Sequence, residues 1–111
     1  MKPLLQHHIP TFCERFCNFE DAEFRSFEMI SPTAFTITLA LQDASCDFDW
    51  ITLSLEFYDV FDASLIDNDK LPFVNFTEGA TLEYDEGFYF QINAATFYIK
   101  SKTLKYQEGS F

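Results

Sequence analysis

The sequence predicts an α+β fold that is mainly β, with a short N-terminal helix followed by a six- to seven-stranded antiparallel meander. Alternation of apolar and polar residues over 35–41 and 50–57 is typical of half-buried strands. The 15 Phe and five Tyr supply a large apolar area, so a core forms without disulfides. With 111 residues, the chain is expected to be a single domain, residues 1–111, built as a curled sheet or small sandwich.

The helix is predicted over residues 10–18. Thr11 and Glu14 fit a capping box, with Thr11 as N-cap and Glu14 three positions later. Phe12 and Phe16 then lie one turn apart, as do Cys13 and Cys17. Residues 1–9 are expected to be a mobile N-terminus.

The sheet is predicted over residues 24–106. Its first strands are 24–30, which stops at Ser31-Pro32, then 35–41 and 50–57. In the last two, the residues expected to face inward are Phe35, Ile37, Leu39, Leu41, Ile51, Leu53, Leu55 and Phe57. Tyr58 to Asp62 either continues the third strand or breaks from it.

The second half of the sheet begins with an expected edge strand over 71–76, because Pro72 cannot donate to a ladder. Strands 80–84 and 88–93 form a hairpin around Asp85-Glu86-Gly87, and 97–106 is the last strand. Lys100 and Lys102 share one face of that last strand. They protect an edge if the strand is peripheral, and they pair with acids across the sheet if it is central.

The net charge of −11, from 18 acids and seven bases, disfavours direct binding to nucleic acid or to an anionic membrane. The N-terminus has no apolar stretch of a signal peptide, and no segment is long enough to span a membrane. Three cysteines without a secretion signal indicate free thiols in a reducing compartment. We therefore expect a cytoplasmic protein.

Acidic residues are concentrated in one stretch of the chain that contains no basic residue. Residues 26–69 contain nine carboxylates and no Lys, Arg or His. Most of these acids lie in two predicted loops, 43–49 and 59–69, with aromatic residues between them. An acidic patch with aromatic anchors is typical of a surface that binds a basic protein. The candidate partner-binding residues are Asp43, Asp47, Phe48, Asp49, Tyr58, Asp59, Phe61, Asp62, Asp67 and Asp69.

This pattern predicts a non-catalytic interaction protein that neutralises a basic partner such as a toxin or nuclease. The interpretation depends on whether the two loops meet on one surface, which the sequence leaves open. If they lie at opposite ends of the sheet, the acids are better read as a solvated rim. Two alternatives stay open: a Phe-lined cavity that binds an apolar ligand, and a homo-oligomeric structural subunit.

Catalytic and metal motifs are disfavoured. His7 and His8 are adjacent and point apart, and the spacing of Cys13 and Cys17 is looser than that of structural zinc motifs. A calcium loop starting at Asp67 lacks the Gly needed at its sixth position, which is Pro72. Three glycines are too few for a phosphate-binding loop. We expect neither an enzyme nor a cofactor.

A resemblance adds to this interpretation. Asp21-Ala22-Glu23-Phe24, the strand Ile51 to Val60 and the closing strand Phe97 to Lys102 resemble the small acidic β-rich immunity proteins encoded beside bacterial polymorphic toxins. The resemblance covers residues 19 to 106 and consists of strand order and an acidic, aromatic texture. It implies a stoichiometric, non-catalytic binder of a toxin domain, and it carries over no site residues.

Overall fold

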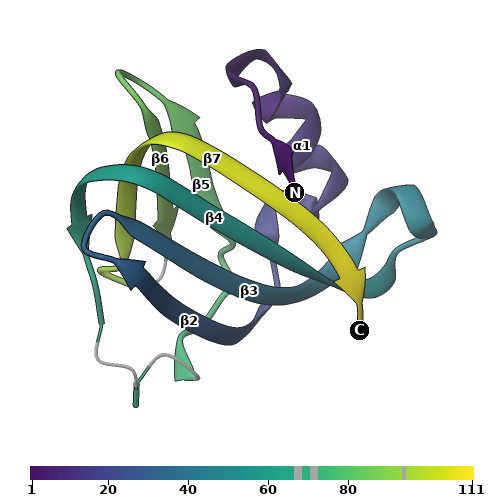
Figure 1. Ribbon diagram of the computed structural model, residues 1–111. Helices are drawn as coiled ribbons and strands as arrows, with labels where there is room; N and C mark the ends of the chain where they lie inside the picture. The colour runs from purple at the N-terminus through teal and green to yellow at the C-terminus, as the bar shows by residue number, and fades with distance from the viewer. Residues whose placement is uncertain (67–68, 71–72, 94) are drawn as a thin grey trace.

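A computed structural model describes residues 1–66, 69–70, 73–93 and 95–111, and it confirms the predicted fold class. One short helix packs on a seven-stranded antiparallel sheet that is not closed (Figure 1). The elements are β1 (Lys2–Pro3), η1 (Gln6–His8), α1 (Ile9–Arg15), η2 (Cys17–Phe19), β2 (Glu23–Ser31), β3 (Ala34–Asp43), η3 (Ala44–Cys46), β4 (Asp49–Ser64), β5 (Ala80–Tyr84), β6 (Phe88–Ile92) and β7 (Tyr98–Ser110).

The strand order departs from a simple meander at one point. The sheet runs β2-β3-β4-β7-β6-β5, with β1 added along β7. Both halves are meanders, but the long connection from 65 to 79 carries the chain to the far edge before β5 begins. The second meander therefore runs back toward the first, and β7 closes against β4. β7 is thus central, which excludes the edge interpretation of its lysines.

The helix is shorter than predicted and begins differently. α1 spans Ile9–Arg15, and its N-cap is His8, without a side-chain capping bond. Thr11 lies inside the first turn, so the predicted capping box is wrong. Pro10 suits the first turn because the N–H groups there have no intrahelical acceptor. The helix ends before 18 because Cys17, Asn18 and Phe19 have positive φ angles.

Part of the N-terminal segment 1–9, expected to be mobile, is attached to the sheet through residues 2–4. Lys2 and Pro3 lie opposite Tyr106 and Lys105 of β7. Leu4 is buried, and its backbone N–H donates to the Leu104 carbonyl oxygen at 2.9 Å. The N-terminus therefore pairs with β7 beyond the part of that strand that β6 covers.

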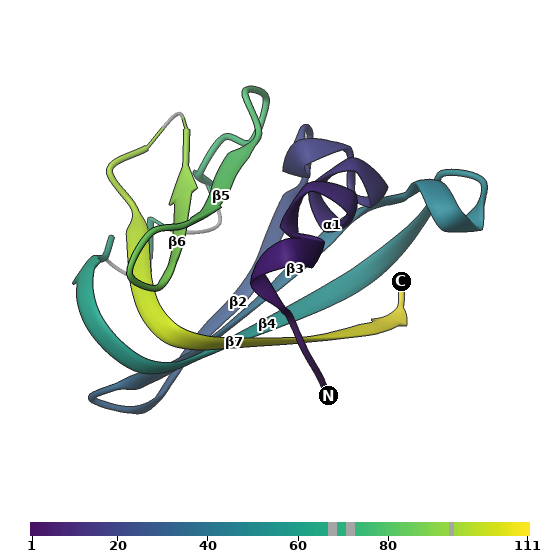
Figure 2. The same ribbon diagram turned by 90° about the horizontal axis from the view of Figure 1, so that it is seen from above.

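The two central strands, β4 and β7, are longer than predicted and bend together. Tyr58 to Asp62 continues β4, which settles the alternative that the sequence left open. In both strands the spacing of inward-facing residues lengthens from two to three at the same level. Phe57 is followed by Val60 in β4, and Leu104 is preceded by Ser101 in β7. Seen from above, the sheet curls at this level into an open trough that holds α1 (Figure 2).

The predicted edge strand over 71–76 is not formed in the part of it that the structure describes. Residues 73–76 are a short turn followed by irregular chain, while 71–72 lie outside the described residues. Phe76 is nevertheless buried in the core, and its carbonyl oxygen accepts from Asp21 N–H at 2.9 Å and from Gly79 N–H at 2.8 Å. The segment is therefore anchored by one aromatic side chain rather than by a ladder.

Aromatic side chains from the helical region fill the trough. Phe12 and Phe16, predicted to be one turn apart, have ring centroids 5.0 Å apart. Phe19 meets Phe90 of β6 at 5.7 Å, edge to face, and Phe57 of β4 contacts the same ring at 5.9 Å. Each such pair adds about 0.5–1.5 kcal/mol beyond its buried area. The excess of Phe is therefore explained largely by the core.

Gly79 is required where the chain enters β5. Its φ is +73°, and a Cβ there would lie 2.4 Å from the Asn18 carbonyl oxygen. We predict that Gly79→Ala lowers the free energy of unfolding by about 1–2 kcal/mol or more, because of left-handed strain and a backbone clash. Gly109→Ala is the matched control, since Gly109 has no left-handed φ and its Cβ would meet a side-chain atom, the Thr52 hydroxyl at 2.6 Å, rather than backbone. Equal midpoints of urea unfolding for the two variants would contradict this account.

Candidate binding surface

The two acidic loops lie at opposite ends of β4. Asp47 precedes the strand, whereas Asp59 and Asp62 lie in its second half. The ten steps along the chain from Asp49 to Asp59 correspond to about 33 Å of strand. The loops therefore do not form one continuous patch, and each end has to be considered separately.

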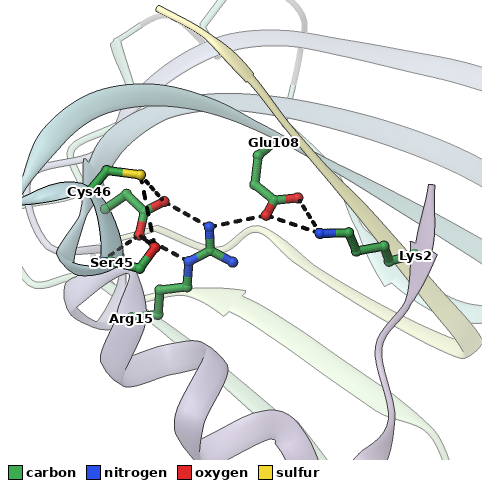
Figure 3. A network of polar contacts seen from close by, with 6 residues as sticks. Lys2, Arg15, Ser45, Cys46 and Glu108 are labelled. Carbon is green, nitrogen blue, oxygen red and sulfur yellow. Dashed lines mark hydrogen bonds and ion pairs between the residues drawn. The ribbon is translucent and has the colours of Figure 1, made fainter.

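Asp43 is not available to a partner. Its side chain is 1% exposed and accepts two hydrogen bonds from Arg15 of α1, from Nε at 2.9 Å and from Nη2 at 2.8 Å (Figure 3). The backbone N–H and hydroxyl of Ser45 also donate to it. The predicted partner-binding role of Asp43 is thus corrected: this carboxylate fixes the loop to the helix.

The polar network continues from Arg15 to the N-terminus. Arg15 Nη2 lies 3.0 Å from Glu108 of β7, and Lys2 Nζ lies 3.4 Å from the same carboxylate. The hydrogen bonds from Arg15 hold the pKa of Asp43 far below its usual range, although burial opposes this shift. The pKa of Glu108 is also lowered, because hydrogen bonds and the cations outweigh its desolvation. The network therefore holds β1, α1, the 43–49 loop and β7 together.

At the loop end, the other predicted residues are exposed. Asp47 and Phe48 both have left-handed backbones, and Phe48 is 55% exposed. Next to them, Trp50 lies 5.9 Å from Phe111, whose ring also lies 5.1 Å from the Arg25 guanidinium carbon. Asp49 is exposed at the start of β4. This end is thus a small aromatic cluster with two exposed carboxylates, Asp47 and Asp49.

At the other end, the predicted residues lie at the bend of the sheet. Asp59 is exposed with a φ of +55°, and Phe61 is the extra residue of a β-bulge between Val60 and Asp62. Tyr58 faces outward beneath Lys105, whose Nζ lies 5.2 Å from the ring centroid. Asp69 is exposed, and Asp67 lies outside the described residues.

Asp62 is compensated by neighbours on β7. Its carboxylate accepts from the Tyr98 hydroxyl at 3.2 Å and lies 4.0 Å from Lys100 Nζ. Lys100 also lies over the rings of Tyr89 and Tyr98, which stack on each other with centroids 5.8 Å apart. The sequence predicted that lysines of this strand would pair with acids on a neighbouring strand if the strand were central. β7 is central, and Lys100 pairs with Asp62 of β4.

The β5–β6 turn packs against this bend. A Cβ on Gly87 would lie 2.8 Å from the Phe61 ring, so Gly87 allows the ring to rest on the turn. Lys102 Nζ lies 5.0 Å from the Phe61 ring centroid and donates to the Glu86 carbonyl oxygen at 3.3 Å. Glu86 has a φ of +60°. The backbone is thus irregular at three positions of this area: Asp59 and Glu86 are left-handed, and Phe61 forms a bulge. Irregularities of this kind are common at functional surfaces.

We call this area the hairpin-tip surface. A groove of about 280 Å³ opens beside it, lined by Leu5, Tyr84, Phe88 and Lys102 among others. Phe61 is 49% exposed, Leu5 46% and Tyr84 40%. Among the residues that the structure describes, Asp59, Asp85 and Glu86 have no ion pair. The hairpin-tip surface comprises Leu5, Asp59, Phe61, Tyr84, Asp85, Glu86 and Lys102.

Five of these seven residues were not identified from the sequence. Asp85 and Glu86 were recognised only as turn residues, and Leu5 was assigned to a mobile segment. The available signal was the pair of acids in a predicted hairpin turn. Its proximity to Phe61 depends on β7 pairing with β4, which local sequence does not encode.

Other kinds of site find little support within the described ranges. No cluster of three or more His, Cys, Asp or Glu is placed to hold a metal there, and no helix there is long and apolar enough to cross a membrane. Burial raises the pKa of the Cys13 thiol to about 11, as expected for a small side chain on an apolar helix face. The ligand-binding cavity and the homo-oligomer stay predictions.

No family model, curated protein or solved structure matches the chain. Its function is therefore argued from the surface itself rather than from relatives.

We predict that Asp43→Asn lowers the free energy of unfolding by about 2–3 kcal/mol near neutral pH, through loss of charge-assisted hydrogen bonds to a buried group. Because folding lowers the pKa of Asp43, its stabilisation is full above the unfolded pKa and is lost as pH falls below it. The deficit of the variant should therefore be constant from about pH 5 to 8 and should shrink below about pH 4.

Chemical unfolding across this pH range measures the deficit, with Asp47→Asn as the control. Asp47 is exposed in the same loop and has no ion pair among the described residues. A deficit that grows toward acidic pH would show that the carboxylate of Asp43 does not act as a paired charge.

Proposed function

We propose that this protein is a non-catalytic, acidic binding protein that engages a basic protein partner, such as a toxin or nuclease domain, through the hairpin-tip surface. The observation that carries the proposal is that apolar and acidic side chains are exposed together on this surface. Exposed apolar side chains border a groove, and three exposed carboxylates of the same surface make no ion pair with any residue that the structure describes. Interface hot spots have this arrangement of aromatic anchors inside a polar rim.

The charge balance supports a basic partner. The hairpin-tip surface contains three carboxylates, of Asp59, Asp85 and Glu86, and one cation, Lys102. The Lys102 ammonium is already directed to the Glu86 carbonyl oxygen and the Phe61 ring. The net charge of −11 extends the negative field beyond the surface. Such a field steers an oppositely charged partner and raises the association rate, with a strong dependence on salt.

The hairpin-tip surface supports the proposal better than the loop end does. It joins residues from the N-terminal segment, β4, the β5–β6 turn and β7, so its shape is fixed by several elements. At the loop end, Asp43 is already bound to Arg15, which leaves Asp47 and Asp49 as the acids without an ion pair in the described part of the chain. Preorganised surfaces bind at lower entropic cost.

The test captures partners from the native host on three immobilised forms of the protein at low salt. These are the wild type, a tip variant (Asp59→Asn, Asp85→Asn, Glu86→Gln) and a control (Glu28→Gln, Asp47→Asn, Asp49→Asn). Both triple variants lose the same charge. For a captured basic protein, we expect the tip variant to slow association about tenfold and the control by less than about twofold.

The association rate should also fall steeply as ionic strength rises, because the charges are exposed. An acidic partner, or association unchanged in the tip variant, would refute the proposal. Slower association in the control alone would place the binding surface at the loop end instead.

Phe61 is the expected anchor of the interface. Phe61→Ala should weaken binding of the captured partner by about 2 kcal/mol, or roughly thirtyfold, as for a hot-spot aromatic residue. The loss of folding stability should be small, because half of the ring is already exposed. Titration calorimetry measures the affinity, and Phe48→Ala at the loop end is the control. Equal losses in both variants would argue against a localised anchor.

A further inference from the structure

One edge of the sheet is open, regular and bordered by the helix. β5 is the last strand in the sheet order, and within the described ranges it pairs with β6 alone. All five of its residues, Ala80 to Tyr84, pair with β6 in continuous register without a bulge. An edge of this kind presents unpaired backbone donors and acceptors to any extended chain that reaches it.

The hydrogen bonds around β6 show which backbone groups of β5 face outward. Ile92 donates its N–H to the Phe97 carbonyl oxygen at 3.1 Å, on the β7 side. In an antiparallel strand the N–H and C=O of one residue point to the same side, and the side alternates along the chain. Ala80 lies opposite Ile92, so this pair is not hydrogen-bonded, and the backbone groups of Ala80 point away from β6.

The same alternation applies along the strand. Asn93 N–H donates to the Gly79 carbonyl oxygen at 3.2 Å, which confirms the phase. The N–H and C=O groups of Leu82 and Tyr84 therefore also point to the open edge. No backbone or side-chain hydrogen bond from another element reaches these groups in the described part of the chain.

A groove runs along this edge. Its volume is about 580 Å³, and its lining includes four consecutive β5 residues, Ala80 to Glu83. The opposite wall is one face of α1, with Ile9, Pro10, Cys13 and Glu14. A groove between an edge strand and a helix is a geometry in which extended peptides add to a sheet: backbone bonds provide affinity and alternate side chains provide specificity.

We propose that the basic partner inserts an extended segment into this groove, where it adds to β5 as a further strand. This inference rests on the proposed function for the charge of the partner. Residues opposite Ala80 and Leu82 would face the apolar side, since both of these side chains are buried. Residues opposite Thr81 and Glu83 would face outward, where Glu83 favours Lys or Arg across the ladder. The segment is therefore one in which apolar and basic residues alternate.

Charge also decides against a second copy as the occupant. Two β5 edges would bring together molecules that each carry a net charge of −11, with Glu83 and Glu14 of both at the contact. The other edge, β2, is a poorer acceptor of a strand. Register shifts at Arg25 and Ile30 interrupt its ladder near both ends, and bulges of this kind blunt an edge.

The test measures binding of the wild-type protein to synthetic seven-residue peptides that alternate Val and Lys. Fluorescence polarisation of the labelled peptides gives the affinity. In an added strand, every second peptide amide points to β5 and the others point to solvent. N-methylation of the first set removes the hydrogen bonds to β5, whereas N-methylation of the second set leaves them intact. We expect one set to weaken binding about tenfold to hundredfold and the other by less than about twofold. Equal effects of both sets, or no effect of either, would overturn strand addition.

Two further measurements locate the peptide and separate the two proposals. Binding should slow amide exchange at Leu82 and Tyr84, and unchanged exchange there would overturn the site. Glu83→Lys, an exposed position, should reverse the preference so that a Val–Glu peptide binds better than the Val–Lys peptide. An unchanged preference would contradict pairing at Glu83.

The remaining outcomes distinguish this inference from the proposed function. In one outcome, Val–Gln and Val–Lys peptides bind equally while N-methylation of one amide set still weakens both. That result would support strand addition and contradict the preference for a basic partner. If no peptide binds while the captured basic protein still depends on the tip carboxylates, the proposed function holds and strand addition fails. Concentration-dependent dimerisation in sedimentation velocity, with Leu82 and Tyr84 protected, would assign the edge to a second copy and overturn the inference.

Discussion

The bend shared by β4 and β7 is the constraint on which the rest of the structure depends. Phe57 pairs with Leu104 on one side of the bend, and Val60 pairs with Ser101 on the other. Because one extra residue separates the inward positions in each strand, their ladder stays in register from Phe57 to Val60 while the sheet turns. The register shifts only afterwards, at the Phe61 bulge. The Val60 N–H also donates to the Thr33 carbonyl oxygen at 3.0 Å, and the Ser101 hydroxyl donates to the Thr103 carbonyl oxygen at 3.1 Å.

This bend produces both the core and the surface. It directs the far halves of β4 and β7 around the helical region, so Phe19 and Phe57 meet Phe90 in one cluster. On the outside, Asp59 lies between the pairs Tyr58–Thr103 and Val60–Ser101 and therefore opposite Lys102. The exposed acid, the bulged Phe61 and the β5–β6 turn thus come together as a consequence of curvature, without any motif in the local sequence.

The sequence predicted what depends on local alternation, and it missed what depends on long-range pairing. β3 was recognised because Phe35, Ile37 and Leu39 alternate with polar residues, and the β5–β6 hairpin because Gly87 ends its turn. The length of β4 was left open because Tyr58 and Asp59 look like the end of a strand when inward positions are expected at every second residue. Asp43 was misassigned for a similar reason: its partner Arg15 lies 28 positions away on another element.

If strand addition to β5 occurs as proposed, the carboxylates near this edge, Glu83 above all, meet two opposing demands. An open, unbulged strand such as β5 invites association with other copies of the chain, and like charge is one way in which proteins prevent it. Under the proposed strand addition, Glu83 and the neighbouring acids of the turn would repel another molecule of this protein and would attract a basic segment to the same hydrogen-bonding groups. Discrimination between self and partner then requires no difference in backbone geometry, because the repulsive and attractive cases differ only in the sign of one charge. This explains how β5 can remain open, whereas β2, which carries Arg25 and exposed Met29 and Ile30, relies on bulges to disrupt its edge.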